Sequence, residues 1–161
     1  MNIEGDADDF DRLKAEVDGD ELSLRQRTRL FQRNRGLDLT VRVTMPAVEA
    51  LDFHRGIASH VSGIASDSLS VEVSTGAEVR LSGTCGRLDL DLSTGGVLSA
   101  RDLVCQSVDI DSSTGGEARV FASDRAEASA STGASIRIFG QPAERETRAS
   151  MGGEIRFDRG D

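Results

Sequence analysis

Five short Gly-centred segments recur along the last two-thirds of the chain at nearly constant spacing. Four of them read Ser-Thr-Gly and the last reads Ser-Met-Gly, and consecutive glycines stand 19, 20, 18 and 19 residues apart. These glycines are Gly76, Gly95, Gly115, Gly133 and Gly152. Such a period is too short for a helical-hairpin repeat or a propeller blade, and it suits one coil of a stacked β-solenoid. The spacing therefore predicts a repeat protein.

Apolar and polar residues alternate on both sides of each glycine. Before Gly95, for example, Leu88, Leu90 and Leu92 are separated by Asp89 and Asp91. Successive side chains of a strand point to opposite faces, so we expect the apolar columns to point inward and the polar columns to face solvent. The alternation is clear over three coils and weakens in the last two.

Each glycine is expected at a corner between two short strands, because a sharp bend often needs a positive φ, which costs Gly little. The same register extends one coil upstream, where the run ending at Gly56 aligns with the run ending at Gly76. The predicted corners are Gly56, Gly76, Gly95, Gly115, Gly133 and Gly152. Together they predict an all-β solenoid of about five to six coils that starts by about residue 49.

Upstream of the repeat the organisation changes. We expect an amphipathic helix over 6–17, with Asp6 as its N-cap, followed by strands at 22–24 and 37–43 around an arginine-rich turn. Terminal repeats of such arrays must be atypical, so residues 1–48 are predicted to cap one end of the solenoid, which occupies 49–161. We expect these two parts to form a single domain over 1–161.

Charge and composition exclude several classes of protein. A net charge of −9 and a pI near 4.7 argue against nucleic-acid binding, which requires a basic footprint. No apolar run approaches the ~20 residues that span a bilayer. The first residues do not resemble a signal peptide, and we expect the natural signal sequence to be missing from the printed chain. Trp and Tyr, the usual sugar-stacking side chains, are absent.

The two cysteines are expected to stack in adjacent coils. Cys85 and Cys105 each stand ten residues before a corner glycine. Strand spacing of about 4.8 Å falls within the Cα range of disulfides, but parallel Cβ vectors would hold the sulfur atoms slightly too far apart. We therefore favour a buried thiol pair over a disulfide. A metal site is disfavoured because nearby His or Asp ligands are lacking.

Acidic residues on the outer face are the next candidates for chemistry. Asp89, Asp91, Asp109 and Asp111 should form stacked rows that could hold calcium, although charged outer columns are also ordinary in solenoids. A catalytic constellation is not expected, because no serine or cysteine is positioned by sequence to use His54 or His60. Acids and arginines are expected on different faces, so we predict neither catalytic residues nor a cofactor.

A column of arginines follows the corners on the other side. Its members are Arg80, Arg119, Arg137 and Arg156. They form either a contact surface for a partner or a strip that keeps the sheet soluble. Stacked like charges slightly destabilise a sheet, and neighbouring glutamates can offset this by diagonal pairing. We favour the solubility role.

Several segments resemble a known bacterial family. They are Val41–Pro46, Leu81-Ser82-Gly83, Leu88–Ser93, Ala100–Leu103 and Phe139–Pro142. In residues and spacing they resemble the putative auto-transporter adhesin, head GIN domain, although that family's corners usually read Ser-Gly-Ala rather than Ser-Thr-Gly. The resemblance implies a right-handed parallel β-helix, exported behind a signal or lipoprotein sequence, with no established activity.

Three functional hypotheses follow. The first is a non-catalytic extracytoplasmic binding or adhesion module, in the periplasm or on the cell surface, whose partner is a protein or glycan of the envelope. The alternative is a structural scaffold that self-assembles into a homo-oligomer through the solenoid ends. The third, a carbohydrate-active enzyme, is the least favoured because the chain lacks the expected basic residues set against metal-binding acids.

Overall fold

A computed structural model describes residues 2–5, 11–26 and 39–158, and it divides the chain into two compact units, residues 1–46 and 47–161. All regular structure in the described residues is β-strand. The division falls close to the boundary expected near residue 49. The single-domain assignment and the capping role of the first unit stay predictions.

The first unit contains two antiparallel strand pairs. Strand β1 (Asn2–Gly5) pairs with β4 (Leu39–Arg42), and β2 (Leu13–Asp18) pairs with β3 (Glu21–Gln26). The predicted helix over 6–17 is therefore wrong in its described part, residues 11–17, while 6–10 lie outside the described residues. Leu13 and Val17 fit a helical stripe, but Leu13, Ala15 and Val17 also alternate as a strand.

The predicted pairing of the strands at 22–24 and 37–43 is also wrong, and the arginine-rich turn expected near 33–36 lies outside the described residues. Both segments contain strands, but 21–26 pairs with 13–18 through a turn at Gly19, whose φ is 60°. Strand β4 pairs with the start of the chain instead. The Gly19-Asp20 pair between two alternating runs is a hairpin signal, and it could have been used to find this turn from sequence.

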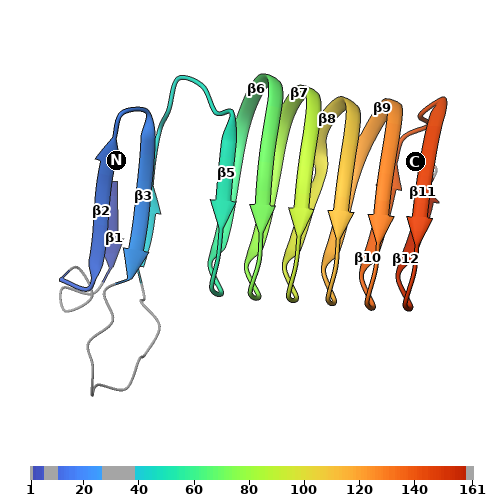
Figure 1. Cartoon of the computed structure of the whole chain (residues 1–161). Helices are drawn as coiled ribbons and strands as arrows, with labels where there is room; N and C mark the ends of the chain where they lie inside the picture. Colours follow the sequence, from blue (N-terminus) through green and yellow to red (C-terminus); the bar gives the residue numbers. More distant parts are fainter. Residues whose placement is uncertain (1, 6–10, 27–38, 159–161) are drawn as a thin grey trace. The chain divides into compact units, whose positions relative to one another are not determined.

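The second unit is the predicted β-solenoid (Figure 1). Its parallel sheet runs in the order β5 (Ala50–Phe53), β6 (Ala58–Val73), β7 (Glu78–Leu92), β8 (Val97–Ser112), β9 (Glu117–Ala130), β10 (Ser135–Phe139) and β12 (Glu154–Asp158), and β11 (Glu144–Ala149) pairs with β9. Residues 50–53, 70–73, 89–92, 109–112, 127–130 and 146–149 form one continuous ladder, so six coils are stacked.

Strands in the middle of the solenoid are longer than the short strands expected. Each of β6, β7, β8 and β9 runs from one corner to the next and bends on the way, as the curved ribbons of Figure 1 show. Register shifts accompany the bend, between Val61 and Ile64 in β6 and between Ala100 and Val104 in β8. The coil therefore turns by β-bulge on one side and by a tight corner on the other.

The predicted inward columns form the core. Leu88, Leu90 and Leu92 are at most 2% exposed, as are Leu69, Ile110 and Ile138 in other coils. The polar residues between them, such as Asp89 and Asp91, face solvent. The buried hydrophobic residues are all aliphatic apart from Cys85 and Cys105.

The corners are tight turns with two consecutive residues at positive φ. At the corner after β7, Thr94 has φ 51° and Gly95 has φ 72°, and the Gly96 N–H donates to the Ser93 carbonyl (3.1 Å). This is the pattern of a type I′ turn. Glycine suits the second position, whereas a β-branched residue at the first is strained unless the surroundings hold it.

Hydrogen bonds between neighbouring corners stabilise the strained residue at the first position. The Gly76 N–H donates to the Thr94 carbonyl (3.2 Å), and the Gly95 N–H donates to the Thr114 carbonyl (3.0 Å). The same bond recurs at the other corners, so each strained Thr carbonyl is fixed by the glycine of the adjacent coil. Serine contributes its backbone carbonyl, rather than its hydroxyl, to closing the turn.

Candidate functional site

Carboxylates at one register position form a row across neighbouring coils just before the corners. Glu72 pairs in register with Asp91, and Asp91 with Asp111, so the strand alternation places all three side chains outward. We call Glu72, Asp91 and Asp111 the acid column. In the next two coils the same position holds Ser129 and then Arg148. On the other side Glu72 pairs in register with Asp52, so acidic residues occupy this position in the first four coils. The acid column is the part of this row that lines the hollow described next.

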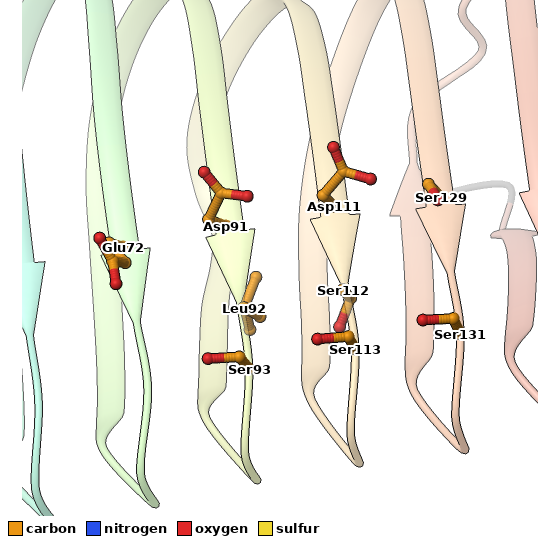
Figure 2. A pocket seen from close by; sticks show the side chains of 9 residues that line it. All are labelled: Glu72, Asp91, Leu92, Ser93, Asp111, Ser112, Ser113, Ser129 and Ser131. Carbon is orange, nitrogen blue, oxygen red and sulfur yellow. The ribbon is translucent and has the colours of Figure 1, made fainter.

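A shallow hollow of about 340 Å³ lies along the acid column. Figure 2 shows Ser93, Ser113 and Ser131 in a second row nearer to the corners, so carboxylates and hydroxyls line the hollow together. Ser112 also borders it, but this residue is 3% exposed and its hydroxyl faces the corner inside the coil, where a Cβ on Gly116 would lie 2.6 Å from the Oγ. That hydroxyl has no hydrogen-bond partner among the described residues.

Electrostatic repulsion accumulates within the acid column. Partial burial raises the pKa of Asp91 above 3.8, and the neighbouring charges of Asp111, Asp89 and Glu72 raise it further. Among the described residues no cation forms an ion pair with any member of the column. The described residues therefore leave the charge of this row without a counter-ion.

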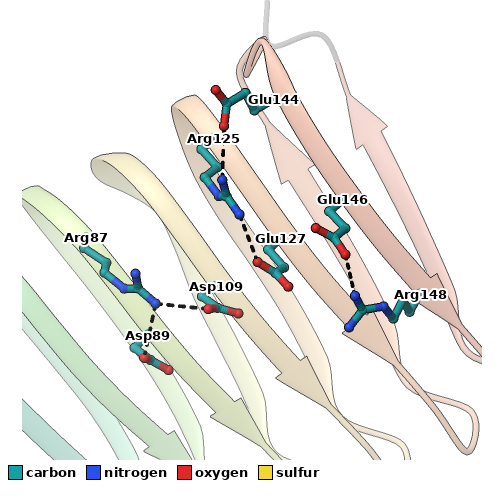
Figure 3. Close-up of polar contacts among 8 residues, drawn as sticks. All are labelled: Arg87, Asp89, Asp109, Arg125, Glu127, Glu144, Glu146 and Arg148. Carbon is teal, nitrogen blue, oxygen red and sulfur yellow. Dashed lines mark hydrogen bonds and ion pairs between the residues drawn. The ribbon is translucent and has the colours of Figure 1, made fainter.

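The adjacent acidic row is neutralised within the protein. Arg87 lies 3.1 Å from Asp109 and 3.8 Å from Asp89 (Figure 3). Arg125 lies 3.2 Å from Glu127 and 3.1 Å from Glu144. Our expectation that acids and arginines occupy different faces is therefore wrong. Arg87 and Arg125 share the acidic face because they stand two residues before the carboxylates on the same strands, which returns their side chains to the same side.

The pKa of Asp109 is also raised. Partial burial is the main cause, followed by the charges of Glu127 and Asp89, while Arg87 opposes the shift. The four aspartates considered for calcium thus divide into an arginine-paired row, Asp89 and Asp109, and an unpaired row, Asp91 and Asp111. Within the described part of the chain, no three His, Cys, Asp or Glu side chains come together in a way that could hold a metal ion. The calcium site stays a prediction without structural support.

The predicted arginine strip lies on the strands that follow the corners. Three of its members pair with a glutamate two residues earlier on the same strand: Arg80 with Glu78 (3.0 Å), Arg119 with Glu117 (2.6 Å) and Arg156 with Glu154 (2.5 Å). The remaining member, Arg137, lies 3.5 Å from Asp158. Same-strand pairing therefore takes the place of the diagonal pairing we expected. These contacts leave the strip with little uncompensated charge.

One histidine has a serine neighbour that sequence reasoning missed. His54 Nδ1 lies 2.5 Å from Ser74 Oγ, because His54 occupies in the first coil the position that serines occupy in the others. The statement that no serine is positioned to meet a histidine is therefore wrong. The alignment of the coils contains this signal, since residues at equal distance before two corners must stack. Ser74 is only 8% exposed, so a substrate has little access to its hydroxyl.

The cysteines form a disulfide, contrary to the thiol pair that we favoured. Cys85 and Cys105 face each other in register, with Cα atoms 4.5 Å apart. This separation is shorter than the usual strand spacing, and it occurs in the bend where the β7–β8 and β8–β9 registers shift. The straight parallel ladder assumed from sequence does not apply at a bend, so the argument from parallel Cβ vectors fails there.

A family described as "Putative auto-transporter adhesin, head GIN domain" matches residues 1–142. This chain belongs to that family. The match covers most of the solenoid and ends before β11, so the last coil lies outside it. The family's description indicates an adhesion-type role. Together with the solenoid fold, this description favours a non-enzymatic protein. It also favours a location outside the cytoplasm.

A solved structure supports the fold assignment. The chain is similar to a "putative adhesin" from Bacteroides fragilis, with a TM-score of 0.74, 17% sequence identity, and coverage of 97% of this chain and 81% of that one. At this identity the likeness establishes the fold alone. No protein of curated function matches the chain. Among the described residues there is no helix long and apolar enough to cross a membrane.

Proposed function

We propose that this protein is a non-catalytic binding module of the adhesin type, located in the periplasm or on the surface of a bacterial cell, and that its acid column contacts a positively charged envelope or surface component. The observation that carries the proposal is the unpaired charge of Glu72, Asp91 and Asp111 beside a row of serine hydroxyls. Other outer carboxylates, such as Asp109 and Glu117, have arginine partners.

Repulsion within the column favours binding of a cation. Like charges that face each other across neighbouring strands destabilise a sheet by about 0.2–1 kcal/mol for each pair. A cationic group placed between neighbouring carboxylates of the acid column offsets this repulsion. Binding is therefore favoured by relief of the repulsion as well as by direct attraction. The rigid ladder also holds the carboxylates in place before binding, so little conformational entropy is lost.

A non-catalytic role agrees with the chemistry of the hollow. Its lining consists of carboxylates, serines and one leucine, and no described histidine, lysine or cysteine belongs to it. The His54–Ser74 pair lies outside this lining, and its serine is largely buried. The lining offers charge and hydrogen-bonding groups, which are what recognition of a polar surface requires.

The disulfide supports a location outside the cytoplasm. Bonds such as Cys85–Cys105 form and persist in oxidising compartments and are rare in the cytosol. The adhesin description of the family points the same way. Export through a signal sequence belongs to this proposal and can be tested on the natural gene product by following its location after cell fractionation.

The binding proposal can be tested with a matched pair of variants and an oligolysine peptide as the probe. Asp91→Asn/Asp111→Asn removes two negative charges from the acid column. Glu78→Gln/Glu117→Gln removes two negative charges from the glutamates that pair with the arginine strip. Affinity is measured by calorimetry at low and moderate salt. We expect the acid-column variant to bind about tenfold or more weakly than the wild type, while the control changes little. An equal loss in both would contradict a defined site.

The adhesive role itself needs a second measurement. Beads coated with the wild-type protein are scored for adherence to bacterial envelope fragments and to a host-cell layer, with beads carrying an unrelated acidic protein as the control. We expect adherence above the control that declines with the Asp91→Asn/Asp111→Asn variant. Adherence no greater than the control on both surfaces would overturn the adhesin proposal, whatever the peptide result.

A further inference from the structure

The last coil is much less buried than the coils before it. Strands β11 and β12 pair with β9 and β10, and no described strand lies beyond them in the sheet. Every residue of β11 is exposed, and Ile155 and Phe157 of β12 are only half-buried. The inward positions of this coil are therefore not covered by another described strand.

Arg145 occupies one of these inward positions. Its register partner in the preceding coil is Ala126, and the same column holds Leu69, Leu88 and Val108 in earlier coils. An arginine thus replaces an aliphatic side chain in the C-terminal coil, which has a described neighbour on one side only. The repeat pattern alone would place an apolar residue at this site.

Two contacts hold the Arg145 side chain across the end of the core. Its guanidinium carbon lies 4.6 Å from the centroid of the Phe157 ring, and its Nε donates to the Pro142 carbonyl (2.9 Å). Phe157 pairs in register with the fully buried Ile138, so its ring continues an inward column. The guanidinium covers this ring by a cation–π contact and keeps its remaining N–H groups in water.

We propose that Arg145 is a plug that prevents a second copy of this chain from stacking on the C-terminal coil. An uncovered coil presents unpaired backbone groups and an apolar interior, which together are a template for another chain. Stacking would bury the guanidinium away from water, at a high cost for an unpaired charge. Contact between two C-terminal ends would also bring two such charges together.

Outward arginines of the same coil cannot act in this way. Arg148 is ion-paired with Glu146 and Arg156 with Glu154, and their register places them on the outer surface. End-to-end stacking would leave both in solvent. This difference provides a matched control, because Arg145 and Arg148 lie on the same short strand and carry the same charge.

The proposal is independent of the acid column, and it predicts a monomer rather than the self-assembling scaffold considered from sequence. The test is molar mass by light scattering after size-exclusion chromatography, over a wide range of protein concentration. Wild type and Arg148→Leu should keep a constant monomer mass. Arg145→Leu, which restores the apolar column, should reach about twice the monomer mass or more as concentration rises.

Several outcomes would overturn the plug. One is an Arg145→Leu protein that has the wild-type circular dichroism spectrum and yet stays monomeric at every concentration. Another is equal association of Arg145→Leu and Arg148→Leu, which would reflect charge loss alone. A wild-type mass that climbs with concentration would also contradict it.

If Arg145→Leu does not fold, Arg145→Ala replaces it. That variant should associate and should bind more of a hydrophobic dye because Phe157 is uncovered, and a folded monomer without added dye binding rejects the proposal.

Discussion

The central coils and the last coil are built from the same repeat but differ in how well they bury it. In β7 and β8 the inward residues Leu88, Leu90 and Ile110 are about 1% exposed, whereas β11 has no buried residue. A central coil is covered on both sides, but the described strands cover the last coil on one side only. The burial of an inward side chain therefore depends on the coils on either side of it more than on its own strand.

The largest expected effect is a difference between two truncations of the core. Leu90→Ala, in a fully buried column, should lower the free energy of unfolding by about 2–5 kcal/mol. Ile155→Ala, in the half-buried last coil, should cost at most about half as much because part of that side chain already contacts water. Urea unfolding followed by circular dichroism measures both. Equal losses would show that the last coil is packed as tightly as the centre.

The disulfide should make a somewhat smaller contribution and belongs to the central coils only. Its half-cystines are separated by 20 residues, and closing a loop of this size contributes roughly 3 kcal/mol. Cys85→Ala/Cys105→Ala should therefore lower the melting temperature. A reductant present during unfolding should lower the melting temperature of the wild type and leave that of the double variant unchanged. A wild type insensitive to the reductant would mean that the bond does not hold the central coils together.

The smallest effect concerns charge and should depend on pH. The raised pKa of Asp91 means that the folded state holds its proton more tightly than the unfolded state, so this group adds stability as pH falls through the raised value towards 3.8. At pH 7 its charge costs stability. Asp91→Asn should therefore stabilise the protein at pH 7 by less than about 1 kcal/mol, with no gain below pH 3.8.

Arg148 is the counterpart of Asp91 in the last coil, because it occupies the same register position. Arg148→Gln removes an exposed ion pair and should cost at most about 0.5 kcal/mol at pH 7. Melting temperatures of both variants between pH 3.5 and 8 provide the comparison. A gain from Asp91→Asn that persists unchanged at the lowest pH would point to an effect other than charge.

Much of the solenoid could be predicted because its signals are local. A corner glycine and the alternation around it can be recognised from a few consecutive residues, and the same pattern recurs in six coils. The first unit has no repeat to correct an error. There the Leu13–Val17 run satisfied a helical and a strand pattern at once, and the pairing of β1 with β4 joins segments far apart in the sequence.

The candidate site was predicted less completely than the fold. Stacking of Asp91 on Asp111 followed from the repeat, but the division into paired and unpaired carboxylates did not. That division depends on where long side chains such as Arg87 and Arg125 reach, and Arg87 contacts a carboxylate of the next coil, 22 residues away. The His54–Ser74 contact was available from the same alignment and was overlooked.

Sequence by itself determined the repeat, the corners and the set of residues that point inward, because a period of two along each strand and of about 19 along the chain follows from backbone geometry. Only the tertiary structure decided which charges neutralise one another, that Cys85 and Cys105 are close enough to bond, and that Arg145 lies over Phe157. These contacts form between coils, at bends and at an end, where distances depend on local departures from the regular ladder that no single strand encodes.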